Sequence, residues 1–239
     1  MGNIDGDTYL TTETLNVCLR ATVAWIRAVD AHREKQGSVG FALTRPPGHH
    51  AKYNLQNGFC LFNFAAAAAL HCSEKGQKVA VLDWDVHYGQ GVADIVRQRA
   101  NNNTIRYVSL HQVPAFPYEG EQLAKDDQVL TIPLQPDTTW ACGYEEKFHQ
   151  ALEYLTEWDP EVVLVCAGYD ALSSDDLASV NLNADDYGKM TELLIENFPD
   201  ARIAFGLEGG YQLDDVGPTG NLGDAFAKTV GAFLDKNYQ

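Results

Sequence analysis

Four short runs of almost uninterrupted apolar residues recur along this sequence, at 39–44, 79–84, 162–169 and 202–208, and a fifth, more mixed run spans 105–111. Runs that do not alternate with polar residues are typical of strands buried on both faces of a parallel sheet. Helix-like segments lie between them at 61–74, 144–158 and 184–197, the last after the candidate N-cap Asn183. A further long helix is predicted over roughly 12 to 35, ending near Gly37. This alternation predicts an α/β fold, a single-domain three-layer sandwich over 1–239 with a mostly parallel sheet.

The charge of the chain narrows the classes of partner. Its formal net charge is −16, from 33 acidic and 17 basic residues. Such a surface repels phosphate groups, so we expect no direct nucleic-acid ligand. A cationic peptide or amine is better tolerated, although plain solubility also accounts for the charge.

Membrane and secretory signals are missing from the sequence as given. No run reaches the roughly 18 apolar residues of a membrane span, and the start MGNIDGDTYL lacks the pattern of a secretory signal. The five cysteines form no CxxC pair and mostly lie in apolar runs, which indicates buried thiols in a reducing compartment. We therefore expect a soluble, intracellular protein of the cytoplasm.

Polar and small residues follow each predicted strand. The segments are RPPGHH (45–50), DWDVHYGQG (83–91), SLHQ (109–112), GYD (168–170) and EGGY (208–211). Because ligands bind beyond the carboxyl ends of strands in open α/β sheets, this distribution predicts a catalytic face at one edge of the sheet.

Asp85, His87 and Asp170 are candidate metal ligands. Asp85 and His87 are two residues apart, so in an extended segment both side chains point to the same side. A carboxylate and an imidazole there, with Asp170 from another strand end, suit zinc or ferrous iron with an open catalytic position. The alternative is structural, with Asp85 capping a turn, His87 buried in the core and Asp170 capping a helix.

His49, His50 and Tyr211 are candidate catalytic groups. The two histidines follow a stiff Pro-Pro-Gly turn and are suited to act as base and acid, with Asp83 and Gln90 as partners that fix their tautomers. Tyr211 follows two glycines, and its hydroxyl is placed to bind an oxyanion. A surface histidine pair and a tyrosine packed over a turn are the alternatives. Phe59 and Phe116 either line a hydrophobic entrance or belong to the core.

Six motifs in this order resemble those of the histone deacetylase superfamily, closest to its class II-like branch. They are RPPGHHA (45–51), NGFCLFN (57–63), DWDVHYGQG (83–91), YVSLHQ (107–112), CAGYDA (166–171) and LEGGY (207–211). The resemblance covers the chain from about Gly40 onward. It implies the arginase–deacetylase fold and zinc-dependent hydrolysis of an acyl amide, usually that of N-acetyl-lysine, with ferrous iron as an alternative metal.

The resemblance also implies roles for single residues. It implies metal ligation by Asp85, His87 and Asp170, a general base and acid at His50, an electrostatic partner at His49 held by Asp83, and carbonyl polarisation by Tyr211. Gln90 matches the partner of His50. The walls of the acyl-lysine tunnel match Gly58, Phe59 and Phe116. A structural potassium site is implied at Asp83, Asp85, His87, Ser109 and Leu110.

The sequence departs from the family pattern at three places. Tyr88 stands where a second histidine is usual, and Gln90 stands where Asp or Asn is usual. Most members also carry an N-terminal section before the first motif, so we expect an N-terminally short domain here. Apolar surface exposed by the lack of that covering would favour a homo-oligomer.

Other activities of related chemistry remain open at this point. The expected substrate is an acetylated peptide, protein or amine. An acetylpolyamine deacetylase is an alternative, but Leu177 stands near the position where polyamine-selective relatives have an acidic residue, which favours a lysine peptide. A binuclear ureohydrolase needs metal ligands that Tyr88 and Gln90 do not provide. A silent acyl-lysine binding module is the alternative from another class.

Overall fold

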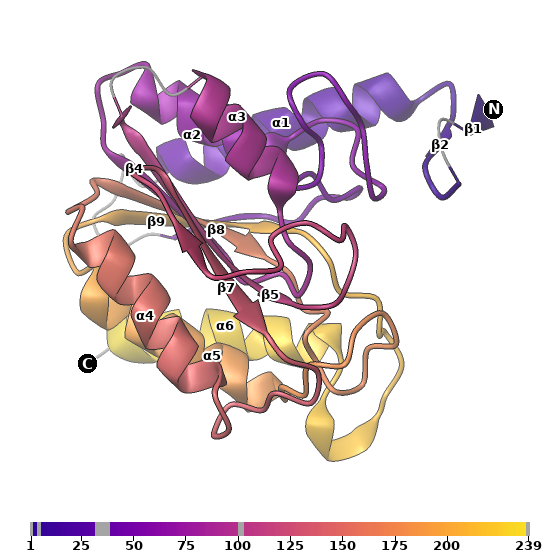
Figure 1. Ribbon diagram of the computed structural model, residues 1–239, viewed down its shortest axis with the longest axis vertical. Coiled ribbons are helices and arrows are strands. Elements are labelled where there is room, and N and C mark those ends of the chain that lie inside the picture. Colours follow the sequence, from indigo (N-terminus) through magenta and orange to yellow (C-terminus); the bar gives the residue numbers. More distant parts are fainter. Residues whose placement is uncertain (1, 4–5, 32–38, 100–102, 238–239) are drawn as a thin grey trace.

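The apolar runs form the centre of a seven-stranded sheet with the order β3-β9-β8-β4-β5-β7-β6. All neighbours pair in parallel except β6 and β7. The computed structural model describes residues 2–3, 6–31, 39–99 and 103–237 (Figure 1). The strands of this sheet are β3 (Gly40–Ala42), β4 (Val79–Asp83), β5 (Ile105–Gln112), β6 (Ala124–Lys125), β7 (Val129–Leu134), β8 (Val162–Ala167) and β9 (Arg202–Leu207).

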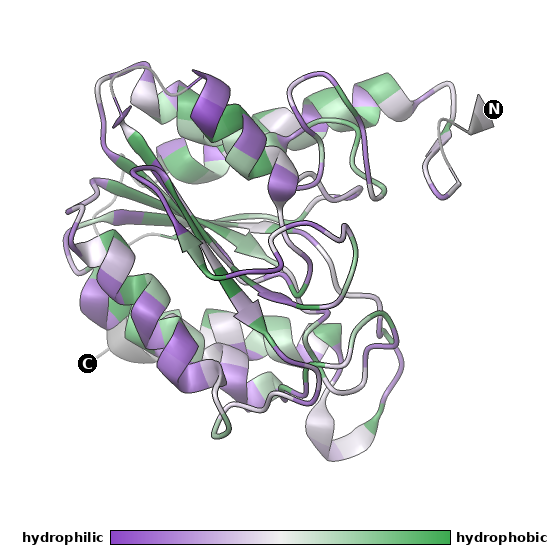
Figure 2. Cartoon of the chain, viewed as in Figure 1, coloured by the Kyte–Doolittle hydropathy of each residue, from purple (hydrophilic) through white to green (hydrophobic). Residues whose placement is uncertain are grey.

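Helices cover both faces of the sheet, as Figure 1 shows. One layer holds α1 (Thr14–Ala31), α2 (Phe64–Ser73) and α3 (Gln90–Arg99), and the other holds α4 (Tyr144–Thr156), α5 (Ala184–Asn197) and α6 (Leu222–Asn237). Alternate residues of one strand serve the two layers. On β4, Val79 and Val81 pack with the α1–α3 layer, whereas Ala80 and Leu82 pack with the α4–α6 layer. This double burial explains the absence of alternation in the sequence, and the central strands are mostly green in Figure 2. The predicted α/β fold with a mostly parallel sheet is confirmed.

Local sequence signals account for two of the helix starts. Asn63 caps α2, where its side chain accepts a hydrogen bond from Ala66 N, and the alanines that follow let the helix approach the sheet closely. Asn183 and Asp186 form a capping box at the start of α5. The predicted N-cap at Asn183 is therefore confirmed.

Several predicted boundaries differ from the observed ones. The first helix begins at Thr14 and is described as far as Ala31, so its predicted end near Gly37 lies outside the described residues. The predicted runs 162–169 and 202–208 extend beyond the observed strands, since β8 ends at Ala167 and β9 ends at Leu207. Sequence analysis did not identify β6, β7, α3, α6 or the small antiparallel pair of β1 (Gly2–Asn3) and β2 (Tyr9–Leu10). A short 3-10 helix, η2 (Gly217–Thr219), precedes α6.

Helix α1 is apolar on more than its inner side. Leu15, Leu19 and Val23 are exposed by 59%, 49% and 46%, although Trp25 on the opposite side is fully buried. None of the helices in the described part of the chain has the length and hydropathy of a membrane-spanning segment. Four cysteines are buried as expected, and Cys142 is exposed.

The centre of the sheet is a topological switch point. From β4 the sheet grows through β5 and β7 in one direction, and from β8 it grows through β9 in the other. Because β4 and β8 pair in parallel, the loops that follow them leave from the same edge. In open α/β sheets this crevice is where ligands bind.

Candidate active site

Asp85, His87 and Asp170 meet at this crevice. Asp85 and His87 follow β4, and Asp170 follows its neighbour β8. One potential ligand atom from each residue lies within 4.8 Å of the others. The Nδ1 atom of His87 is 3.0 Å from Asp170 Oδ2 and 3.4 Å from Asp85 Oδ1. The expectation of an extended segment is wrong, because β4 ends at Asp83 and the two ligand candidates lie in a bend beyond it.

Backbone amides and closely packed glycines hold the two carboxylates. Gly209 N donates to Asp85 Oδ2 at 2.6 Å, and Val86 N donates to Asp170 Oδ1 at 3.0 Å. A Cβ atom on Gly209 would lie 2.1 Å from Asp170 Oδ2, and one on Gly168 would lie 2.3 Å from Asp85 Oδ2. Only glycine leaves room for the carboxylates, which explains why glycines follow β8 and β9.

The charges at this cluster fit a bound cation. Burial lowers the pKa of His87, but hydrogen bonds to Asp170 and Asp85 outweigh that effect and raise it to about 11. Burial and the charge of Asp85 raise the pKa of Asp170 to about 6. Two carboxylates fully removed from water are costly unless they are paired or bind a metal. Their oxygens and one imidazole nitrogen are a donor set that suits zinc or ferrous iron, so the residues present fit a divalent metal.

His49 and His50 lie beside this cluster, and each has a partner. His49 Nδ1 is 3.1 Å from Asp83 Oδ2, and His50 Nδ1 is 2.6 Å from Gln90 Oε1. Both imidazoles are buried, and their ring centroids are 4.0 Å apart. The pairings expected from the sequence, His49 with Asp83 and His50 with Gln90, are therefore present in the structure.

The surroundings of the two histidines separate their pKa values. Burial lowers the pKa of His49, but the carboxylates of Asp85 and Asp83 outweigh it and raise the pKa to about 10. Burial, followed by the positive charge of His49, lowers the pKa of His50 well below its ordinary value. At neutral pH His49 is charged and His50 is neutral. The oxygen of Gln90 then accepts the Nδ1 proton of His50, which leaves Nε2 free to take another proton.

Sequence analysis missed two buried side chains that support these groups. The Tyr107 hydroxyl donates to Asp83 Oδ2 at 2.7 Å, and Asp175 Oδ2 accepts from Tyr211 N at 2.6 Å. A tyrosine in a buried strand needs a partner for its hydroxyl, and this requirement could have identified Tyr107. Asp175 lies in an acidic pair within a loop, which gives no such signal.

Aromatic rings lie against His50 and against Tyr211. The Phe116 ring lies 4.9 Å from that of His50, and the Phe59 ring lies 6.1 Å from that of Tyr211. A Cβ atom on Gly58 would lie 2.7 Å from both the His50 and the Phe116 rings. Gly58 and Phe116 thus lie at His50, and Phe59 lies at Tyr211.

Leu177 is tied to the same neighbourhood through Asp175. Its backbone N–H donates to Asp175 Oδ1 at 3.1 Å, while the other oxygen of that carboxylate holds Tyr211. The Leu177 side chain is 49% exposed. It is therefore a surface residue close in structure to Tyr211.

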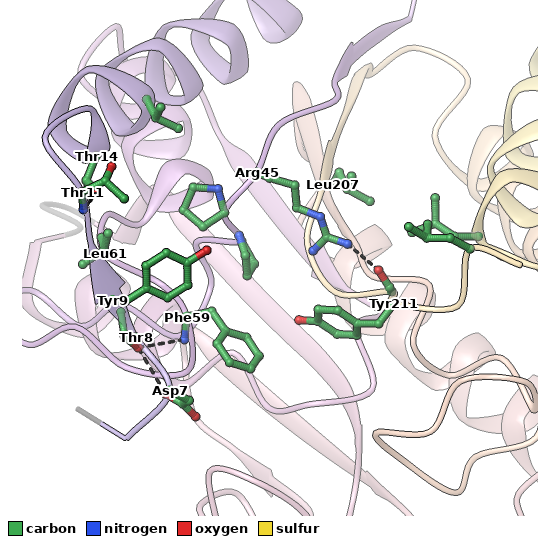
Figure 3. A pocket seen from close by; sticks show the side chains of 16 residues that line it. Asp7, Thr8, Tyr9, Thr11, Thr14, Arg45, Phe59, Leu61, Leu207 and Tyr211 are labelled. Carbon is green, nitrogen blue, oxygen red and sulfur yellow. Dashed lines mark hydrogen bonds between the residues drawn. The ribbon is translucent and has the colours of Figure 1, made fainter. Parts of the chain in front are cut away.

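Phe59 and Tyr211 also border a cavity of about 630 Å³, drawn in Figure 3. Tyr9 and Phe59 line one side of it, and Arg45 and Tyr211 line the other (Figure 3). The Arg45 guanidinium lies over the Tyr211 ring, 5.1 Å from its centroid, and donates to the backbone oxygen of Gly210. Arg45 therefore holds the loop that carries Tyr211 from outside.

The remaining predicted residues lie on the neighbouring strand. Ser109 and Leu110 are fully buried on β5, and Ser109 pairs with Asp83 in the β4–β5 register. Potassium binding at this position stays a prediction. Tyr88 is buried against His111, with ring centroids 4.7 Å apart.

Comparison with known proteins gives consistent relatives. A family model described as the histone deacetylase domain matches residues 1–220. The chain is 43% identical to an uncharacterised protein of Synechocystis sp., over 90% of this chain and 70% of that protein. It is 33% identical to a probable deacetylase of Archaeoglobus fulgidus, over 93% of this chain and 64% of that protein.

A solved structure extends these similarities to the fold. The acetylpolyamine aminohydrolase from Burkholderia pseudomallei superposes with a TM-score of 0.83 at 26% identity, covering 97% of this chain and 66% of that chain. The present chain thus spans about two thirds of the length of each of the three proteins.

Proposed function

This chain belongs to the histone deacetylase family, and we propose that it is a zinc-dependent deacetylase that removes acetyl groups from lysine side chains. One observation carries the proposal. Two adjacent buried histidines, each hydrogen-bonded through Nδ1 to its own partner, and the loop that carries Tyr211 lie at the cluster of Asp85, His87 and Asp170. A neutral base, a fixed positive charge and a hydroxyl donor at one candidate metal site are the groups that amide hydrolysis requires.

The metal would be held by the Asp85, His87 and Asp170 side chains. When bound, it would polarise the amide carbonyl and lower the pKa of a water molecule, as zinc and ferrous iron do in hydrolases. Iron remains an alternative, because the donor set suits both metals.

The residues of the chain move the protons. His50 accepts the proton of the attacking water at Nε2, since its Nδ1 proton is held by Gln90. His49 stays protonated between Asp83 and Asp85 and stabilises the negative charge that develops on the substrate. His50 then returns the proton to the departing amine.

Tyr211 serves as a hydrogen-bond donor. Burial and the carboxylates of Asp170 and Asp85 raise its pKa far above the ordinary value, so the hydroxyl keeps its proton at neutral pH. The O–H group can then donate to the oxygen of the tetrahedral intermediate. The rings of Phe59 and Phe116 exclude water from the stem of the substrate side chain.

An acetylated polyamine is the second candidate substrate. The similarity to an acetylpolyamine aminohydrolase and the net charge of −16 favour a cationic amine. Against it, Leu177 offers no charge to a distal ammonium group. A silent acyl-lysine binder is disfavoured because simple binding needs no such group of buried titratable residues.

The test is hydrolysis of an acetyl-lysine peptide and of an acetylated diamine by the purified chain loaded with zinc or with ferrous iron. Tyr211→Phe is expected to lower kcat by about 100-fold or more, as loss of one oxyanion donor does. Tyr53→Phe, at an exposed tyrosine outside the site, is the matched control and should keep full activity. A chelator should abolish turnover. Absence of turnover on both substrates by a folded, metal-loaded protein would contradict the proposal.

A further inference from the structure

Glu208 is a buried carboxylate that the chemistry above does not use. It follows β9, opens the loop that carries Tyr211, and has no exposed surface. A charged group in such a position is costly unless it is hydrogen-bonded. A structural core could have an apolar side chain at this position, so the carboxylate calls for an explanation.

The Glu208 side chain holds the histidine turn. Its Oε2 accepts hydrogen bonds from Gly48 N at 2.6 Å and from His49 N at 3.1 Å. These amides belong to the turn that presents both imidazoles, about 160 residues away in the sequence. Two backbone N–H groups of one turn bind the same buried oxygen, so this contact anchors the turn.

The backbone around Glu208 is itself fixed on several sides. Arg45 Nη1 donates to Glu208 O at 2.8 Å, and Gly209 N donates to Asp85 Oδ2 at 2.6 Å. Tyr169 N donates to Gly209 O at 3.0 Å. These contacts fix the backbone of Glu208 relative to the metal cluster, independently of the contact between its side chain and the histidine turn.

We propose that Glu208 is a positioning residue, whose carboxylate fixes the backbone of Gly48 and His49 and thereby sets the two imidazoles relative to the metal cluster and Tyr211. The kinetic part of this inference rests on the proposed deacetylase function. The geometric part does not, because it concerns the conformation of the histidine turn alone. Misplacement of a base by about 1 Å can cost about 100-fold in rate, so a rigid anchor has a large effect.

The test compares Glu208→Gln and Glu208→Ala with a matched control. Glutamine keeps the shape and one acceptor oxygen but loses the charge, whereas alanine removes the anchor. Asp186→Asn is the control, because Asp186 is also a buried carboxylate that accepts from a backbone N–H, at the start of α5. In the metal-loaded protein we expect kcat to fall about tenfold in Glu208→Gln and about 100-fold in Glu208→Ala, with KM within about threefold. The control should lose thermal stability without losing kcat.

A second readout does not need turnover. The chain has seven histidines, so protein labelled with 15N-histidine gives seven backbone amide signals. The His49 amide and the ring nitrogens of His49 and His50 should shift in Glu208→Gln, while the signals of His71 and His149 stay in place.

These readouts separate the two proposals. If the wild-type protein is inactive but the His49 and His50 signals shift in Glu208→Gln, the proposed function fails and the positioning role stands. If folded Glu208→Gln keeps the wild-type kcat and leaves these signals unchanged, the positioning role is wrong. A loss of kcat in Asp186→Asn equal to that in Glu208→Gln would reduce Glu208 to a general stabilising role and would also overturn it.

Discussion

Tyr107 and Tyr144 form a matched pair of fully buried tyrosines with opposite hydrogen-bonding states. The Tyr107 hydroxyl donates to Asp83 Oδ2 at 2.7 Å. The Tyr144 hydroxyl, at the start of α4, has no hydrogen-bond partner among the described residues. Substituting each by phenylalanine removes the same hydroxyl group from two fully buried positions. Only the loss of the Tyr107 hydroxyl should therefore destabilise the fold.

The magnitudes follow from the contacts. Tyr107→Phe removes a hydrogen bond to a carboxylate and leaves one oxygen of Asp83 with fewer donors, which should cost about 1.5–3 kcal/mol. Tyr144→Phe removes a hydroxyl that gave up water on folding without a protein partner in return. That substitution should be neutral or should stabilise the fold by about 1 kcal/mol. For a chain of this size, each kcal/mol corresponds to about 2–4 °C in Tm.

Thermal unfolding of the two metal-free variants beside the wild type is the assay. We expect Tyr107→Phe to melt about 3–12 °C below the wild type and Tyr144→Phe to melt at or slightly above it. Chelator in every sample removes any contribution from metal binding. Equal decreases in both variants would refute the reasoning, because they would show that the Asp83 contact adds nothing to the loss of a buried hydroxyl.

Three further substitutions test the packing and the helix starts by thermal unfolding. Asn183→Ala removes the cap that accepts from Asp185 N and should cost about 1 kcal/mol, so an unchanged Tm would contradict the capping box. Gly231→Ala in α6 places a Cβ where no atom lies within 4 Å and should stabilise the helix by about 0.5–1 kcal/mol, whereas a lower Tm would indicate a hidden contact. Gly206→Ala places a Cβ 1.8 Å from the Trp25 ring and should cost more than about 3 kcal/mol, so a near-normal Tm would show that α1 can move away from β9.

The central sheet could be predicted from the sequence because its strands are buried on both faces. The run at 79–84, for example, predicted β4 to within one residue. The strand β7 was not predicted, because a proline such as Pro133 near its end argues against a strand. In the structure β6 pairs only with Leu130 and Thr131 on the outer side of β7, so Pro133 lies beyond the last pair on that side.

The helix α3 was not predicted for a different reason. It begins within the DWDVHYGQG motif, and its second residue is Gly91, which is a poor helix former. A Cβ on Gly91 would lie 2.4 Å from Ala51 O, so the glycine is required by contact with the histidine turn. A requirement of this kind depends on tertiary packing and leaves no periodic pattern in the sequence.

The sequence predicts those site residues that lie in local motifs. It does not predict contacts between segments that are far apart in the sequence. Asp85, His87 and Asp170 were found from their place after strands, and the structure brings them within 4.8 Å. The contact of Glu208 with Gly48 and His49 could not be predicted, because no local pattern relates positions about 160 residues apart.

The pairing of β4 with β8 has a consequence for folding. The chain can be divided in the loop between β7 and α4, and the first part then contains His49, His50, Asp85 and His87, while the second contains the remaining metal candidate and Tyr211. The two parts meet at the β4–β8 pair, where the metal candidates lie, and again at the β3–β9 pair. A ligand at the β4–β8 pair bridges both parts and stabilises only the chain in which both have folded. Metal affinity would thus report completion of the whole sheet, and two separately produced halves that recover metal binding on mixing would have rejoined at its centre.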